Sequence, residues 1–161
     1  MEISPDYEEL FRILNESKIK YLVVGAYAVM FYSEPRFTKD LDIWVIPELN
    51  NPDRVYGALR QFGAPLRRVR PRDFQDKSMI LQIGVAPVRV DVMMDVPAVS
   101  FETAWKNRKK ARYGKTPIYI LGIRELIRAK RKAGRLQDKL DLERLSEQVK
   151  KISPKGRKRV K

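Results

Sequence analysis

Apolar residues recur at helical spacing near the beginning of the chain, from Tyr7 to Leu14. Ser4 and Pro5 precede them, and these residue types favour the N-cap and the first position of a helix. The pattern therefore predicts a helix that packs one face on the core and ends near Ser17.

The pattern of apolar and polar positions predicts the remaining elements in the same way. Short apolar runs rich in β-branched residues predict strands at 21–24, 40–45, 78–83, 88–94 and 118–121, with a turn at 84–87 that joins two of them in a hairpin. Helical spacing predicts helices at 27–31, 52–62, 101–108, 123–133 and 136–149, of which the last two form a helical hairpin at Gly134.

Two basic segments, 65–76 and 106–115, show neither helical nor strand periodicity, and we expect both to be irregular connections. The first holds four arginines, which either touch nucleic acid or belong to a solvated loop. From Ser153 the chain is basic and almost without apolar residues, so a disordered tail is expected there.

The strand that follows Arg36 carries two aspartates in the stretch RFTKDLDIWV. Side chains alternate along a strand, so Asp40 and Asp42 share one face while Leu41 and Ile43 point to the other. Two carboxylates on one face repel each other unless a cation lies between them, and Mg²⁺ prefers such oxygen ligands. The alternative is a solvated pair of carboxylates with nothing bound.

A third aspartate lies within a later strand, VRVDVMM, where Arg89 and Asp91 share a face opposite Val90 and Val92. An aspartate inside an apolar strand is costly unless it has a partner. Asp95 is a competing candidate, but it lies at the end of the strand, where aspartate is common.

Composition limits the chemistry further. The chain has 161 residues, enough for one core, and it contains no cysteine and no histidine. A metal would therefore be held by oxygen ligands, and the usual general base is missing. No apolar run is long enough for a membrane span and the N-terminus is acidic, so we expect a cytoplasmic protein without a membrane partner.

The charge of the chain points to a polyanionic partner. Lys and Arg number 34 against 20 Asp and Glu, which gives a formal net charge of +14. The last twelve residues hold seven of these basic residues and no acidic one, so the remaining chain is basic as well. Nucleic acid is the expected partner, although ion-pair networks of a thermophile protein also require many charged residues.

The glycine at the end of the first strand has two interpretations. Gly25 and Ala26 join the strand to a helix, and such a junction either binds phosphate through backbone amides or is a tight turn. The order of strand, Gly25-Ala26, helix, Pro35-Arg36-x-Thr38 and Asp40-x-Asp42 resembles the nucleotidyltransferase superfamily, which has the DNA polymerase β-like fold. The stretch VVGAYAVMFYSEPRFTKDLDIWV is most similar to the small prokaryotic branch that includes abortive-infection (type IV) toxin nucleotidyltransferases.

The resemblance implies an α+β fold, with a mixed β-sheet flanked by helices, a C-terminal helical hairpin and a basic, disordered tail. The catalytic domain would span 1–121, the hairpin 122–150 and the tail 151–161. Asp40, Asp42 and Asp91 would bind Mg²⁺ or Mn²⁺ and perform catalysis, with Asp91 accepting the proton of the attacking hydroxyl.

The segment LIRAKRKAGRLQDKLDLERL also resembles the C-terminal helical motif of this branch. The resemblance would give the nucleotide site Gly25, Ala26, Arg36, Thr38, Lys39, Lys130, Asp138 and Asp141. For Asp138 and Asp141 the alternative is surface ion pairing with Arg135 and Lys139.

The expected activity is transfer of a nucleoside monophosphate from an NTP to a hydroxyl group. Basicity favours an RNA acceptor, most naturally tRNA; a protein hydroxyl and a small molecule such as an aminoglycoside are the alternatives. In the toxin interpretation a cognate antitoxin is a further partner. Ala26 departs from the Gly or Ser of the superfamily, which keeps open a catalytically silent module that binds nucleic acid or a protein.

Overall fold

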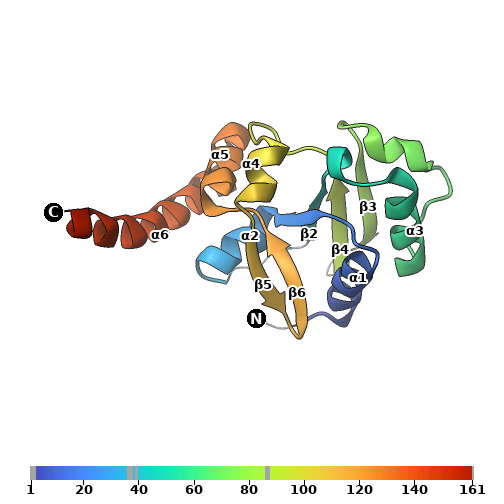
Figure 1. Cartoon of the computed structure of the whole chain (residues 1–161), viewed down its shortest axis with the longest axis horizontal. Coiled ribbons are helices and arrows are strands. Elements are labelled where there is room, and N and C mark those ends of the chain that lie inside the picture. The colour runs from blue at the N-terminus through green and yellow to red at the C-terminus, as the bar shows by residue number, and fades with distance from the viewer. Residues whose placement is uncertain (1–2, 36–37, 39, 86–87, 161) are drawn as a thin grey trace.

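The computed structural model describes residues 3–35, 38, 40–85 and 88–160, with side chains as far as Ile152. Six strands form one mixed sheet in the order β3-β4-β2-β1-β6-β5 (Figure 1). The strands are β1 (Tyr21–Val24), β2 (Asp40–Val45), β3 (Ile80–Val85), β4 (Val88–Met93), β5 (Lys109–Tyr113) and β6 (Thr116–Ile120).

Helices flank the sheet, and the last of them extends away from it. They are α1 (Pro5–Glu16), α2 (Gly25–Tyr32), α3 (Pro52–Phe62), α4 (Phe101–Lys106), α5 (Ile123–Ala133) and α6 (Leu136–Val160), with 3-10 turns η1 (Pro47–Leu49) and η2 (Pro71–Gln75). The predicted α+β fold with a mixed sheet and a C-terminal helix pair is confirmed.

Strand pairing determines which side chains meet. The hairpins β3-β4 and β5-β6 and the pair β1-β2 are antiparallel, whereas β2 pairs with β4, and β1 with β6, in parallel. Parallel pairing requires a long connection, here the segment that contains α3 and η2. It brings the two aspartate-bearing strands next to each other.

The core fills the space between the sheet and its helices. Buried side chains of α1, including Leu10 and Phe11, pack near the first strand, where Phe11 stacks on Tyr21 with ring centroids 5.9 Å apart. α1 contacts α3 and β6, while α2 contacts β1, β2, α5 and α6. The central strands are therefore buried, which explains the continuous apolar run of β1.

Two predicted connections contain regular structure. The segment 106–115 was expected to be irregular, and this prediction is wrong, because β5 (Lys109–Tyr113) pairs with β6 as an edge strand of the sheet. Its lysines are exposed, and lysine protects edge strands from pairing with other chains, so the strand lacks the apolar alternation that would reveal it. In 65–76, η2 buries Phe74.

The C-terminal helix α6 extends away from the sheet in Figure 1. The predicted disordered tail corresponds to its last turns, of which the structure describes the backbone alone. No helix in the described part of the chain is both long and apolar enough to cross a membrane.

Candidate active site

Three aspartates from two neighbouring strands meet on one face of the sheet. Asp42 of β2 lies directly opposite Asp91 of β4 in the parallel register, and Asp40 is two residues earlier on the same face. One carboxylate oxygen of each residue lies within 4.8 Å of those of the other two. The predicted convergence of the three carboxylates is confirmed, and Asp95 is outside the cluster.

The protein environment disfavours negative charge on Asp40 and Asp42. Burial, followed by the charges of Asp40 and Asp91, raises the pKa of Asp42 to about 7. The pKa of Asp40 is also raised, first by burial and then by a hydrogen bond and charge repulsion from Asp91. A divalent cation between the three would remove this repulsion, and carboxylate oxygens are the ligands that Mg²⁺ and Mn²⁺ prefer.

Arg89 partly compensates the charge of the triad. Its guanidinium donates two hydrogen bonds to Asp91, Nε to Oδ1 and Nη2 to Oδ2, both at 3.1 Å. Its backbone carbonyl accepts a hydrogen bond of 2.9 Å from the Tyr7 hydroxyl, which fixes this part of β4. A cation bound by Asp91 would compete with the Arg89 guanidinium. The sequence pattern placed Arg89 on this face but indicated no role for it.

Gly25 lies against the triad. It begins α2 with φ at +66°, a conformation that L side chains rarely adopt. A Cβ atom at this position would overlap Oδ2 of Asp42. The glycine is therefore needed both for the turn and for the close approach of the backbone to a carboxylate.

The other residues predicted near the phosphates fall into two groups. Ala26 follows Gly25 in the first turn of α2, and the Thr38 hydroxyl donates a hydrogen bond of 3.2 Å to the carbonyl of Asp40. Arg36 and Lys39 lie outside the described residues.

Lys130, Asp138 and Asp141 form a buried charge cluster between α5 and α6. The Lys130 ammonium lies 3.1 Å from a carboxylate oxygen of Asp138 and 3.1 Å from one of Asp141. Both aspartates are fully buried, so the placement on the helix surface that the alternative assumed is wrong. They share a helical stripe with the buried Leu145, and this stripe faces inward.

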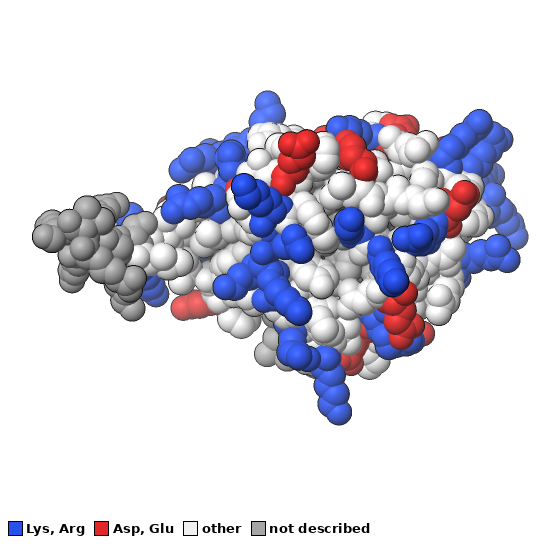
Figure 2. Space-filling view, in the orientation of Figure 1, with Lys and Arg blue, Asp and Glu red and all other residues white. Residues whose placement is uncertain are grey.

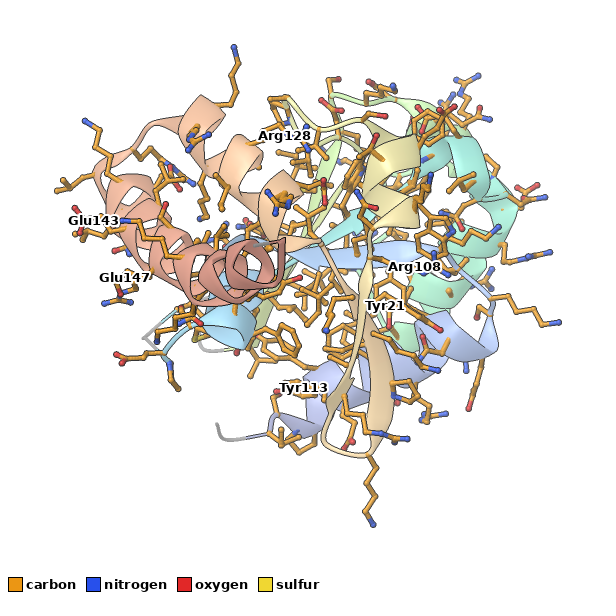
Figure 3. The ribbon with its side chains drawn as sticks, turned by 60° about the vertical axis from the view of Figure 1, so that its left-hand side comes forward. Tyr21, Arg108, Tyr113, Arg128, Glu143 and Glu147 are labelled. Carbon is orange, nitrogen blue, oxygen red and sulfur yellow. The ribbon has the colours of Figure 1, made fainter. Side chains whose placement is uncertain are left out.

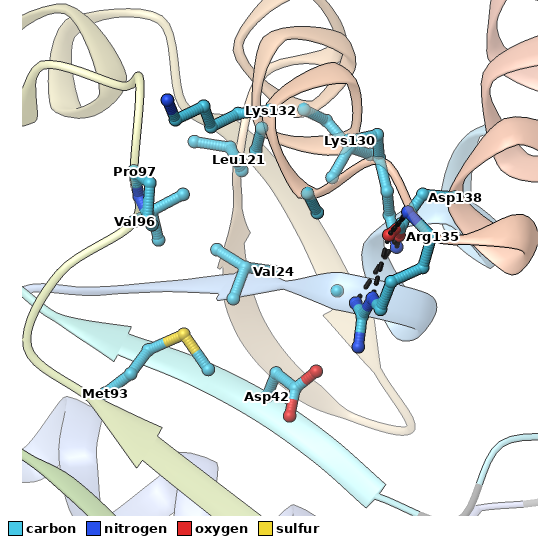
Figure 4. A pocket seen from close by; sticks show the side chains of 14 residues that line it. Val24, Asp42, Met93, Val96, Pro97, Leu121, Lys130, Lys132, Arg135 and Asp138 are labelled. Atoms are coloured by element: carbon cyan, nitrogen blue, oxygen red, sulfur yellow. Dashed lines mark hydrogen bonds and ion pairs between the residues drawn. The ribbon is translucent and has the colours of Figure 1, made fainter.

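Arg135 connects this cluster to the triad. It does pair with Asp138, as the surface alternative proposed, through its backbone N–H at 3.1 Å and its Nε at 2.8 Å. In Figure 4 its side chain extends from Asp138 toward Asp42. The charge of Asp42 contributes to a raised pKa of Arg135, after the larger contribution of Asp138. Arg135 was considered only as a surface partner, because sequence spacing does not show where a long side chain ends.

A cavity of about 340 Å³ lies between the triad and the two C-terminal helices (Figure 4). Part of its lining is apolar, and part carries cationic groups. The apolar part includes Val24, Met93, Val96, Pro97, Leu121 and Leu126, and the cationic side chains are Lys130, Lys132 and Arg135. An apolar surface next to cations and a cluster of metal-ligand type can accept a planar base and a polyphosphate together.

No protein-family model matches the chain, and no curated protein sequence matches it at a significant level. Solved structures share its fold. The lincosamide antibiotic adenylyltransferase LnuA, in its lincomycin-bound structure, aligns with a TM-score of 0.58 and 12% identity over 91% of this chain and 98% of its own. The antibiotic-resistance factor ANT(2'')-Ia aligns with a TM-score of 0.63 and 10% identity over 96% and 91%.

A candidate nucleotidyltransferase from Thermotoga maritima aligns with a TM-score of 0.58 and 18% identity over 96% of both chains. At these identities the similarity establishes the fold alone, and the toxin branch stays a prediction. The chain therefore has the nucleotidyltransferase fold, with three clustered aspartates beside a glycine turn.

Proposed function

We propose that the protein is a metal-dependent nucleotidyltransferase that transfers a nucleoside monophosphate from an NTP to a hydroxyl acceptor and releases pyrophosphate. The observation that carries this proposal is the carboxylate triad within 4.8 Å, which is adjacent to Gly25 and includes Asp42, a lining residue of a cavity with cationic side chains. Asp40, Asp42 and Asp91 would hold two divalent ions, Mg²⁺ or Mn²⁺, which when bound neutralise phosphate charge and acidify the attacking hydroxyl.

The residues of the chain have separate tasks in this proposal. The backbone at Gly25 and Ala26 and the first turn of α2 bind the triphosphate, since no side chain separates that backbone from Asp42. Arg135 stabilises charge on the phosphates. The apolar part of the cavity lining positions the base.

Asp91 is the proposed proton acceptor, because the chain contains no histidine. The two hydrogen bonds from the Arg89 guanidinium keep the Asp91 carboxylate in one orientation. Lys130 is a positioning residue: its charge is already compensated by Asp138 and Asp141, and it holds α6, which begins next to Arg135, against α5.

RNA, with tRNA as the first candidate, is the proposed acceptor, because a net charge of +14 attracts a polyanion. If the enzyme acts as a toxin, the expected protein partner is an antitoxin. A small-molecule hydroxyl is the second candidate, because two structures with the same fold are those of a lincosamide adenylyltransferase and an antibiotic-resistance factor.

The test is incubation with each α-labelled NTP, Mg²⁺ or Mn²⁺, and total RNA, or with lincomycin or an aminoglycoside in its place. We expect label on RNA, and Asp42→Asn should lower the rate at least about a thousandfold, because a charged metal ligand is lost. Asp95→Asn is the matched control, because this aspartate follows β4, the strand of Asp91, but lies outside the triad, and this variant should retain most of the activity.

Label on an antibiotic or on protein would change the acceptor and retain the enzyme class. Equal rates for Asp42→Asn and the parent protein would contradict the assignment of the triad. No transfer, combined with no binding of NTP by calorimetry, would favour a catalytically silent module.

A further inference from the structure

A second concave site lies away from the triad, at the beginning of β1. This groove has a volume of about 350 Å³ and shares no lining residue with the cavity at the triad. Its lining includes Lys18, Lys20, Trp105, Arg108, Lys110 and Tyr119. Lys20 immediately precedes β1, whereas Val24 at the end of β1 adjoins Gly25, so the two sites are separated by about 13 Å along the strand.

Hydrogen bonds fix the walls of the groove. The Asn15 side chain donates to the carbonyl of Pro117 at 2.8 Å and accepts from the Tyr21 hydroxyl at 3.0 Å. The Asn50 amide binds both backbone groups of Lys20, at 2.7 and 2.8 Å. The groove is therefore a built feature that joins α1, β1 and β6, and its shape does not depend on exposed side chains alone.

Arg108 forms a platform in the groove with two aromatic residues, whose ring planes are tilted by 52° to each other. Its guanidinium carbon lies 4.0 Å from the centre of the Trp105 ring and 5.6 Å from that of Tyr119, and the two rings are 6.0 Å apart. Its Nη1 also donates a hydrogen bond of 2.7 Å to the Trp105 carbonyl, which holds the guanidinium over the indole. Aromatic rings and guanidinium planes are the surfaces on which unpaired bases stack.

The groove is positively charged without internal compensation. No acidic residue is among its lining residues. In the described part of the chain, Lys18, Lys20, Arg108 and Lys110 have no carboxylate at ion-pair distance. Arg12 on the neighbouring helix face shows the contrast, because it pairs with Glu9 and Glu16.

The backbone at Lys18 adds to this arrangement. Its φ of +56° is unusual for a residue with a side chain, and it turns the chain between α1 and β1. The exposed lysine therefore lies at the groove, next to Asn15 and Lys20.

We infer that this groove binds single-stranded nucleic acid. A base stacks on the Trp105–Arg108–Tyr119 platform, while Lys18, Lys20 and Lys110 contact the phosphates on either side. Figure 3 shows Arg108 on the same part of the molecule as Tyr21 of β1. The groove would hold the acceptor strand outside the reaction centre; this role rests on the proposed function, whereas the binding itself does not.

The test is binding of a fluorescently labelled single-stranded RNA, measured without NTP, by the double variant Lys20→Gln/Lys110→Gln, which removes two of the proposed phosphate contacts. Loss of two phosphate contacts should reduce the slope of log K against log salt by about 1.4 and weaken binding several-fold between about 50 and about 200 mM salt. Arg54→Gln/Arg60→Gln is the matched control, because it removes two exposed arginines from α3. This control should bind as the parent protein does.

Stacking is tested by the emission of Trp105, isolated in a Trp44→Phe variant and also followed in the parent protein, where Trp44 is buried. RNA should quench this emission, single-stranded DNA should do so comparably, and the same RNA in a duplex should not. Equal loss of affinity in both double variants, or RNA binding without quenching, would overturn the inference. The inference would also be overturned if polyglutamate displaced the RNA and caused the same change in the emission of Trp105. Asp42→Asn should bind RNA normally, so failure of the groove and failure of the catalytic proposal are distinguishable.

Discussion

Gly25 and Asp42 occupy a space that leaves no room for a methyl group. Gly25→Ala would place a Cβ against the Asp42 carboxylate at a backbone φ of +66°. We expect a loss of about 1 kcal/mol or more in the free energy of unfolding, since alanine at positive φ is strained. We also expect at least about tenfold weaker Mg²⁺ binding, because a ligand is displaced.

Chemical denaturation and metal titration by calorimetry would measure these effects. Gly57→Ala is the control, because Gly57 lies in the middle of α3 and an added Cβ meets nothing within 4 Å. There the substitution should stabilise the protein by about 0.5–1 kcal/mol. An unchanged Mg²⁺ affinity in Gly25→Ala would contradict the close packing of glycine and carboxylate.

The pKa of Asp42 predicts how pH affects metal binding. Burial and the neighbouring aspartates raise this pKa to about 7 in the folded protein, whereas the unfolded chain has the ordinary value of 3.8. The folded state therefore keeps a proton that the unfolded state releases. The contribution of Asp42 to stability is full below about pH 4 and is lost as pH rises through about 7.

A metal ion must displace this proton, so we expect Mg²⁺ affinity to increase from about pH 5 to about pH 7 and then to level off. Calorimetric titrations across this range would measure it. Asp42→Asn should flatten the pH dependence of the melting temperature of the metal-free protein. The same pH dependence in both proteins would contradict the raised pKa.

At the scale of residues, alternation along the strand was sufficient to predict that Asp40 and Asp42 share one face, and the resemblance to nucleotidyltransferases implied that Asp91 completes the cluster. Asp91 was preferred to Asp95 because an aspartate inside an apolar strand needs a partner. Arg89 and Arg135 were not predicted as members of the site. Their guanidinium groups lie several bonds from the backbone, and the contacts of such long side chains depend on tertiary structure.

Among the elements, α5 and α6 depend on one buried lysine. Lys130→Met would leave Asp138 and Asp141 buried without its ammonium, and breaking a buried pair costs about 3–5 kcal/mol. We expect the double variant Lys130→Met/Asp141→Asn to lose less stability than the sum of the single variants. Urea denaturation of the four proteins would give this coupling energy, and strict additivity would contradict a direct interaction.

The helix pair was predicted from apolar spacing and from Gly134, and the prediction is confirmed. The sequence did not settle whether Asp138 and Asp141 are buried. The spacing of a carboxylate along a helix does not show whether it faces the core or the solvent until its partner is known. β5 was missed for a related reason. Tyr113 is the one buried residue of β5, so the strand has no alternation of apolar and polar residues by which the sequence could reveal it.

The whole molecule presents a strongly basic surface. Figure 2 shows lysine and arginine side chains distributed over the visible face, with few acidic ones between them. Truncation after Ile152 removes five basic residues and no acidic one. If they contact phosphates, the salt slope of RNA binding should fall by up to about 3.5.

Titration of labelled RNA at several salt concentrations would measure this slope for the full chain and for the truncated chain. Transfer of a nucleotide to a small acceptor should remain unchanged, which separates the tail from the triad. An unchanged salt slope would show that the tail does not contact nucleic acid.

The fold of the whole chain followed from the order of strand, glycine turn, helix and paired aspartates. The acceptor could not be predicted, because the surfaces that could recognise it are assembled from distant segments, as is the groove between α1, β6 and the residues after α4. A basic composition indicates attraction to polyanions but does not specify the place of contact.

The parallel pairing of β2 with β4 also has a consequence for folding kinetics. Asp42 and Asp91 become neighbours only after the chain between them has closed a long loop, which is slower than forming a hairpin such as β3-β4. A refolding chain should therefore acquire helix and hairpin signals before it can bind a divalent ion. Metal binding would then report a step of native assembly that follows the pairing of β2 with β4.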